Sequence, residues 1–392
     1  MAAIICATAA SADTGGTPRG QLHFAGQSLM EYQARQARDI GVGHVLLLVD
    51  VVTPALSRTV DALSADGMKV QLIRDMATLV RDVPRDSDVV LFADGAIADQ
   101  RYIDMLAQGS GNIVLVAEDS GSTGHFERID GIHRWVGVAR IAPDVLFGTL
   151  DLIGDWDFSL TLLRAAVQAG AKRVTVNAAD VLDGRVALVD RQDTANLVAQ
   201  ALLAPASVAQ GRNAGAEHYL LAPVAGMLTA RLVRMQIPAG RARVGAGGLA
   251  LFGLLMVYPG WLFVAGLVFL AALTANLVAD QLSEMGRRKD GDGWLALVPV
   301  LIVLPGLVAI GAYGGRWDAA LYLALMSLVI LLAVRRGLGG AMPRWAALTP
   351  GSALVLLLIG LMLASEPTLV LLATLCAIFS IGRLLLQAGK SG

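Results

Sequence analysis

The sequence predicts an α/β domain with a doubly wound, mostly parallel sheet, followed by an all-α domain of six transmembrane helices. Two observations predict this division. Up to about residue 243, short apolar strands alternate with helical patterns, whereas residues 244–392 are almost continuously apolar. The whole chain is 55% hydrophobic with a mean hydropathy of +0.62, which is too apolar for a soluble globular protein of 392 residues.

Residues 1–210 carry the signals of the α/β domain. Apolar runs of strand length occur at 4–7, 45–49, 70–73, 89–92, 113–116 and 174–176. Helical patterns lie between several of them, at 28–40, 53–63, 102–107 and 158–169. Strands that alternate with helices favour a parallel, doubly wound sheet, in which ligands bind at the carboxyl ends of the strands.

Six apolar segments follow. All but the first, which is short, have roughly the length of about 20 residues that a membrane span needs. They cover 244–257, 260–281, 294–313, 317–334, 346–364 and 367–386. The sequence Tyr258-Pro259-Gly260 predicts a turn between the first two. The preceding stretch, 211–243, is either a linker or an interfacial helix, because Arg231 and Arg234 stand among apolar residues.

Basic residues fix the expected orientation of these spans. With residue 240 in the cytoplasm, twelve lysines and arginines near the spans are cytoplasmic and only Arg316 lies on the opposite side. This positive-inside pattern predicts six spans in the cytoplasmic (inner) membrane, with both termini in the cytoplasm.

Charge and cysteine usage exclude several classes of protein. Residues 1–240 have a net charge of −6, which gives no reason to expect nucleic-acid binding. Cys6 and Cys376 stand alone, so neither a disulfide framework nor a zinc site is indicated. Apart from Asp280 near an end, the predicted spans lack buried ionisable residues, which disfavours an ion-coupled transporter.

Six segments in order resemble sugar-1-phosphate nucleotidyltransferases. They are residues 18–22 (PRGQL), 26–31 (GQSLME), 41–42 (GV), 88–95 (DVVLFADG), 135–139 (WVGVA) and 188–194 (LVDRQDT). The resemblance implies a nucleoside triphosphate, with CTP favoured, a phosphorylated alcohol and Mg²⁺. It implies Asp94 and Asp190 as metal-binding carboxylates and Arg19 in place of the motif's lysine. Thr8, Gly15 and Gly16 fall in the expected nucleotide loop.

The combination of such a domain with six spans resembles the bifunctional inositol-phosphate cytidylyltransferase/CDP-alcohol phosphotransferases. In that architecture the soluble half makes a CDP-activated headgroup and the membrane half passes it to a membrane lipid. At the matching end of the second span, Asp280 and Glu284 lie one helical turn apart, and the resemblance implies that they bind metal.

Both family motifs are incomplete, so no catalytic residue is assigned. Thr8 and Ala10 stand where the loop motif has glycines, and the D-G and A-R pairs of the membrane motif are absent. The leading hypothesis is therefore a phospholipid-headgroup enzyme of this type with eroded sites. The alternative is a non-catalytic scaffold, with a second copy or an active membrane enzyme as its partner. A weaker alternative is a glycosyltransferase with its D-x-D pair at 155–157.

Overall fold

The computed structural model divides the chain into two compact units, an N-terminal unit of Met1–Leu203 and a helical unit that begins at Ala204. The structure describes residues 1–13, 17–150, 157–209, 215–235, 237–285, 295–313, 315–335 and 348–363, and also 377–378 and 381–382.

The N-terminal unit is built on one eight-stranded sheet in the order β11-β8-β10-β6-β1-β4-β5, with β9 paired to β10. Its strands are β1 (Ala2–Cys6), β4 (His44–Leu48), β5 (Lys69–Ile73), β6 (Val89–Phe92), β8 (Ile113–Glu118), β9 (Glu127–Arg128), β10 (His133–Ile141) and β11 (Lys172–Thr175). Two small ladders join β2 (His23–Phe24) to β3 (Gln27–Ser28) and β7 (Ala96–Ile97) to β12 (Ala187–Leu188). The predicted α/β class is confirmed.

One strand departs from the predicted parallel arrangement. β10 runs antiparallel to both of its neighbours, β6 and β8, so the sheet is mixed. The register between β10 and β8 shifts between Trp135 and Ala139, and Gly137 in that interval has a φ of 91°. A Cβ on Gly137 would lie 2.5 Å from the Cβ of Ala96, so only glycine fits this irregular stretch.

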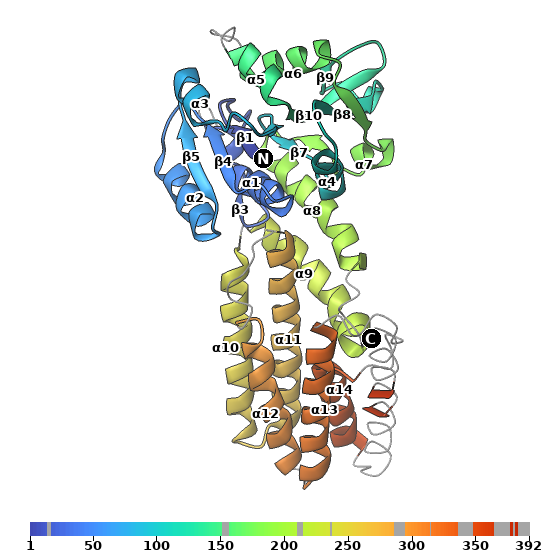
Figure 1. The fold of residues 1–392 in the computed structure, drawn as a ribbon. Coiled ribbons are helices and arrows are strands. Elements are labelled where there is room, and N and C mark those ends of the chain that lie inside the picture. The colour runs from blue at the N-terminus through green and yellow to red at the C-terminus, as the bar shows by residue number, and fades with distance from the viewer. Residues whose placement is uncertain are drawn as a thin grey trace. The chain divides into compact units, whose positions relative to one another are not determined.

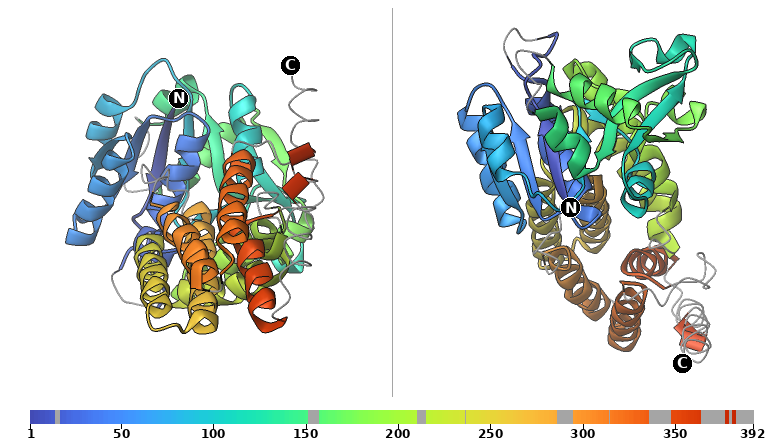
Figure 2. Two further views of the ribbon diagram at one scale, coloured as in Figure 1. Left: turned by 90° about the horizontal axis from the view of Figure 1, so that it is seen from below. Right: turned by 45° about the horizontal axis from the view of Figure 1, so that its top comes forward.

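Helices cover both faces of this sheet (Figures 1 and 2). They are α1 (Leu29–Asp39), α2 (Pro54–Ala65), α3 (Met76–Asp82), α4 (Gln100–Gln108), α5 (Pro143–Leu150), α6 (Phe158–Gln168), α7 (Ala178–Leu182) and α8 (Gln192–Ala209), with short 3₁₀ turns η1 (Arg19–Gln21) and η2 (Gly121–Thr123). α1 contacts α2 and α4, whereas α5 contacts α3 and α6. Capping side chains fix the first residue of several helices. At the start of α1, for example, the Ser28 side chain accepts a hydrogen bond from the backbone N–H of Glu31.

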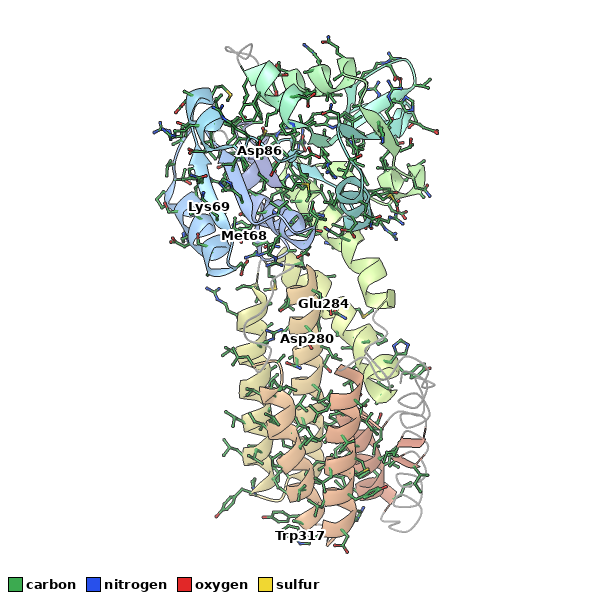
Figure 3. All side chains as sticks on the ribbon, viewed as in Figure 1. Met68, Lys69, Asp86, Asp280, Glu284 and Trp317 are labelled. Carbon is green, nitrogen blue, oxygen red and sulfur yellow. The ribbon has the colours of Figure 1, made fainter. Side chains whose placement is uncertain are left out.

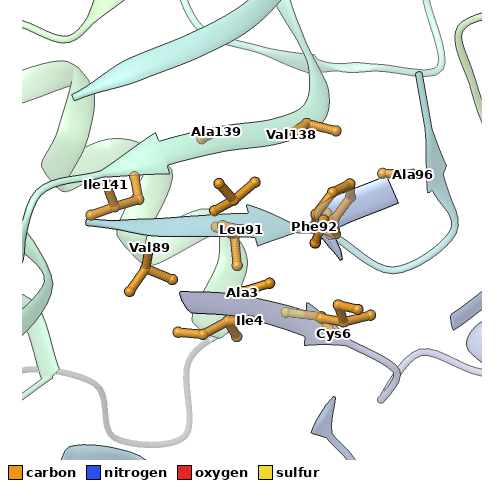
Figure 4. Close-up of a cluster of buried hydrophobic side chains, with 14 of the residues drawn as sticks. Ala3, Ile4, Cys6, Val89, Leu91, Phe92, Ala96, Val138, Ala139 and Ile141 are labelled. Carbon is orange, nitrogen blue, oxygen red and sulfur yellow. The ribbon is translucent and has the colours of Figure 1, made fainter. Parts of the chain in front are cut away.

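The core of the unit lies where the central strands pack side by side. Ile4 on β1 and Leu91 and Phe92 on β6 are fully buried, and Val138 and Ile141 on β10 close the cluster (Figure 4). Because these strands are buried on both faces, they read in the sequence as continuous apolar runs. The same burial holds the strand ends, and the loops that follow them, in fixed positions.

The described part of the helical unit consists mainly of apolar helices. They are the π-helical turn η3 (Glu217–Leu221), α9 (Ala222–Arg234), α10 (Ala239–Val257), α11 (Leu262–Met285), α12 (Val298–Tyr313), α13 (Trp317–Arg335) and α14 (Pro350–Leu363). Phe269 of α11 packs into a notch made by two glycines. A Cβ on Gly306 would lie 2.2 Å from the Phe269 ring, and one on Gly253 would lie 2.8 Å from it. Small residues let apolar helices approach this closely.

The structure does not confirm six membrane spans. Five of the six predicted segments coincide with α10 to α14, and the sixth, 367–386, falls outside the described residues except for 377–378 and 381–382. Among the described helices, only α10 and α11 are long and apolar enough to cross a membrane, and α12, α13 and α14 contain shorter apolar stretches. The prediction counted apolar residues, but regular α-helix begins only at Val298 in the third segment and only at Pro350 in the fifth, where proline suits the first turn.

Candidate functional site

The strand order of the sheet reverses at β1. The chain runs from β1 to β4 and β5 on one side and then returns to β6 on the other side of β1, and these four strands are parallel. At such a reversal the loops leave adjacent strands in opposite directions and open a crevice at the carboxyl ends. The loop after Cys6 and the residues after Phe92 therefore meet at one edge of the sheet.

The loop after β1 is held in a hairpin-like shape. Ser11 N–H donates to the Thr17 carbonyl (2.7 Å), and Ala10 forms an isolated bridge with Pro18. Arg19 closes the base, because its backbone N–H donates to the Ala9 carbonyl (2.8 Å) and its Nε donates to the Ala10 carbonyl (3.2 Å). Gly15 and Gly16, predicted to contact nucleotide, lie outside the described residues.

Asp94 follows β6 and faces this loop. Its Oδ1 accepts the backbone N–H of Ala9 (3.0 Å), and its Oδ2 accepts the Thr8 hydroxyl (3.2 Å). Burial raises the pKa of Asp94, and the hydrogen bonds from Ala9 and Thr8 oppose that rise. The structure thus brings together two predicted site residues, Thr8 and Asp94.

Gly95 lets a second segment rest directly on the Asp94 turn. It has a φ of 76°, and a Cβ on it would lie 2.2 Å from the carbonyl oxygen of Val189. The Val189 N–H donates to the Gly95 carbonyl (2.8 Å). The segment that carries Asp190 is therefore fixed against the end of β6.

Asp190 reaches the loop through its main chain. Its carbonyl oxygen accepts the Ala12 N–H (2.9 Å) and the Ser11 hydroxyl (3.2 Å). Its carboxylate is 40% exposed, with the Nε of Arg191 3.7 Å away. Asp190 thus belongs to the site, but the contacts that place it are backbone contacts. Its predicted role as a metal ligand stays a prediction.

Two residues near the site were not assigned to this site from the sequence, although Asp157 was named in the D-x-D pair of the glycosyltransferase alternative. Asp157 caps α6, accepting the Leu160 N–H (3.1 Å), and its charge raises the pKa of both Asp94 and Cys6, although burial is the larger cause for each. His125 has a pKa lowered by burial, and the charge of Asp190 opposes that shift. The cap signal of Asp157 was visible, but its closeness to Asp94 depends on the fold. The other two residues of the 155–157 motif lie outside the described residues.

In the helical unit, the predicted metal ligand Asp280 pairs with a cation. The Arg243 guanidinium donates from Nη2 to Asp280 Oδ1 (3.3 Å) and to the Ser283 hydroxyl (3.1 Å). Asp280 and Glu284 lie at the opposite end of the helical unit from Trp317 (Figure 3). Metal binding by Asp280 and Glu284 stays a prediction, and a guanidinium already balances the first carboxylate.

Comparisons with known proteins place the likeness in the N-terminal half. No protein-family model and no curated protein matches the chain. Among solved structures, it is similar to the inositol-1-phosphate CTP transferase from T. maritima, with 16% identity and a TM-score of 0.39 over 51% of this chain and 95% of that chain. It is also similar to a putative glucose-1-phosphate thymidylyltransferase from Bacillus anthracis, with 13% identity and a TM-score of 0.36 over 45% of this chain and 87% of that chain. At this level the likeness says nothing about activity.

Proposed function

We propose that the N-terminal unit is a nucleotidyltransferase-type domain that binds a nucleoside triphosphate, with CTP favoured, and a phosphorylated alcohol. The observation that carries the proposal is the reversal of strand order at β1, with Asp94 facing the loop at that point. Open α/β sheets bind their ligands at such a reversal. A loop with backbone N–H groups, an arginine at its base and a carboxylate are the groups that phosphates and their counter-ion need.

Mg²⁺ is the cofactor that this proposal implies, and Asp94 is the residue that fits it best. Mg²⁺ at phosphate sites is usually held by one or two carboxylates, while phosphates and water complete its shell. No cluster of three metal-ligating side chains occurs among the residues that the structure describes. The ion would therefore bind together with the phosphates, whose charge it would offset.

The protein groups around Asp94 would orient the triphosphate. The Ala9 N–H and the Thr8 hydroxyl now point at Asp94, and both are donors that a phosphate oxygen accepts equally well. Arg19 uses Nε to hold the loop, which leaves its terminal nitrogens to bind phosphate oxygens. In this proposal, the Ala9 N–H and the Thr8 hydroxyl would turn from Asp94 to the phosphates when the nucleotide binds, and the freed carboxylate of Asp94 would hold the cation.

The first test is a thermal-shift panel on the detergent-purified full chain with CTP, UTP, GTP and ATP, each with and without Mg²⁺. A nucleotide at 100 times its Kd should stabilise the folded protein by about 2.7 kcal/mol. We expect a Mg²⁺-dependent increase in melting temperature with CTP and a smaller one with the other three. If none of the four changes the melting temperature, the nucleotidyltransferase proposal is wrong.

One observation favours a second candidate function, that of a non-catalytic scaffold for an active lipid-synthesis enzyme. The donors of the loop are already satisfied by Asp94, and Thr8 and Ala10 carry side chains where a phosphate needs close approach to the backbone. A scaffold would show no nucleotide-dependent shift and would co-purify with a second membrane protein.

We propose further that the helical unit anchors the chain in a membrane. Only 22% of the most apolar stretch of α10 is buried, whereas the core helix of a soluble protein is mostly buried. Exposed apolar side chains continue over the other helices; examples are Leu255, Leu301, Leu321, Leu325 and Met362. A nucleotide-activated headgroup made by a membrane-tethered domain would be available for phospholipid synthesis.

The two ends of the helical unit differ as the two faces of a membrane do. Exposed aromatic rings mark one end, namely Tyr258, Trp261, Tyr313 and Trp317, and the Tyr313 hydroxyl donates to the Tyr258 carbonyl (2.7 Å). Arg241 and Arg243 begin α10 at the other end. Aromatic rings concentrate at membrane interfaces and arginines on the cytoplasmic side, so the arginine end is proposed to be cytoplasmic.

Cysteine labelling tests both the anchoring and the orientation. In a Cys376→Ser background, we expect a membrane-impermeant maleimide to label Asp318→Cys in intact cells and Gly240→Cys only after lysis. Both positions are exposed in the structure, and the remaining Cys6 is buried and serves as the unlabelled control. Equal labelling at the two positions in intact cells, or release of the protein by alkaline carbonate, would contradict the proposal.

A further inference from the structure

Two helix starts are tied together in the helical unit. The backbone N–H of Gly351, in the first turn of α14, donates to Oε1 of Glu217 (2.7 Å). In return, the N–H of Ala216, which precedes η3, donates to the Ser352 hydroxyl (2.8 Å). We call these four residues the Glu217 clamp. It joins the first turn of η3 to a helix that lies 134 residues further along the chain.

The second carboxylate oxygen of Glu217 has an unusual environment. Oε2 is buried and has no hydrogen-bond partner in the part of the chain that the structure describes. Leu221, one turn further along the helix, packs in the same buried apolar cluster as Leu348 and Leu354. An ionised carboxylate needs several donors, so a charge held here would be costly, whereas a protonated carboxyl would not carry that charge.

The surrounding elements offer Glu217 little electrostatic compensation. α14 contains no titratable residue. η3 itself contributes His218 and Tyr219, whose ring centroids lie 4.9 Å apart in an edge-on contact. α9, packed against η3, carries Arg231 about 20 Å away at 1.5 Å per residue, and Arg234 follows three residues further along the chain. Burial raises the pKa of Glu217 to about 7, and the Gly351 N–H opposes the rise.

We propose that Glu217 is a proton-operated clamp: protonated, it holds the first turn of α14 against η3, and ionised, it leaves its buried position and releases that turn. The sign follows from linkage. The closed clamp binds the proton more tightly than the open one, so the clamp is most stable below the ordinary carboxyl pKa. Its opening should increase by up to about tenfold per pH unit as the pH rises toward 7, and should level off above that.

The test is hydrogen–deuterium exchange at the Gly351 and Ser352 amides of the full chain in lipid nanodiscs. Exchange is measured from pH 5 to pH 8 and corrected for intrinsic rates. In the wild type, we expect protection to fall more than tenfold between pH 5 and pH 7. In Glu217→Gln, the amide oxygen still accepts the Gly351 N–H but nothing titrates, so protection should not depend on pH. His218→Gln is the matched control and should keep the wild-type dependence.

A second variant keeps the proposal testable if Glu217→Gln does not fold. A Cβ on Gly351 would lie 3.0 Å from Glu217 Cδ and 3.1 Å from Oε1. Gly351→Ala should therefore displace the carboxyl and leave the α14 amides poorly protected at every pH. Constant protection in the wild type, unchanged pH dependence in Glu217→Gln, loss of the dependence in His218→Gln, or wild-type protection in Gly351→Ala would each overturn the proposal.

Discussion

Replacing Asp94 by asparagine is expected to abolish the Mg²⁺-dependent nucleotide binding of the N-terminal unit. Asparagine keeps an oxygen for the Ala9 N–H and an amide that can bond the Thr8 hydroxyl, so the loop after β1 should keep its shape. Only the negative charge that is proposed to hold the cation is lost. We expect binding in the presence of Mg²⁺ to weaken at least about 100-fold, or ~2.8 kcal/mol, as measured by titration calorimetry.

Asp75 provides the matched control for this substitution. It also accepts one backbone N–H and one hydroxyl, both from Thr78 (2.7 and 2.9 Å), but it caps α3 instead of facing the loop. Asp75→Asn should leave nucleotide binding unchanged. If Asp94→Asn binds nucleotide as the wild type does, Asp94 acts only as a brace for the loop.

The raised pKa of Asp94 adds a pH dependence to the same experiment. A cation needs the ionised carboxylate, and burial shifts protonation of Asp94 to a higher pH than is usual for an aspartate. Mg²⁺-dependent binding in the wild type should therefore be lost as the pH falls through that raised pKa. Any residual nucleotide binding by Asp94→Asn should not change over the same pH range.

The sequence predicted the central strands β1, β4 and β6 well because they are buried on both faces. The runs at 45–49 and 89–92, for example, coincide with β4 and β6 to within a residue. No strand was predicted at β10. Its direction could not have been read from the sequence either, because a buried antiparallel strand has the same composition as a buried parallel one. Gly137 marks the irregular stretch of this strand, but its positive φ depends on contacts made only in the folded sheet.

The site was predicted only in part, for a related reason. Asp94 stood out because a carboxylate directly follows an apolar strand, and the structure places it beside Thr8. The contribution of Asp190 comes from its carbonyl oxygen, and every residue has one, so its identity gave no signal. The pairing of Arg243 with Asp280 spans 37 residues and depends on how α10 packs on α11. Sequence spacing does not determine such contacts.

Gly95→Ala is expected to cause the largest loss of stability. The new Cβ would lie 2.2 Å from the Val189 carbonyl oxygen, which is backbone and cannot rotate away. The substitution also places an L-residue at a φ of 76°, at a cost of about 1–2 kcal/mol. The clash should also break the hydrogen bond between the Val189 N–H and the Gly95 carbonyl. We expect the free energy of unfolding to fall by at least ~3 kcal/mol in total, which lowers the melting temperature by roughly 6–12 °C.

Gly111→Ala separates backbone strain from the clash in this experiment. Gly111 has a nearly identical φ of 74° but nothing within 4 Å of its added Cβ, so the variant should lose only about 1–2 kcal/mol. Gly95→Ala should also weaken nucleotide binding, because Asp190 follows Val189 and its carbonyl anchors the loop at Ser11 and Ala12. Equal melting temperatures for the two variants would show that Val189 does not rest on Gly95. A stable Gly95→Ala that binds nucleotide normally would place the ligand away from this edge of the sheet.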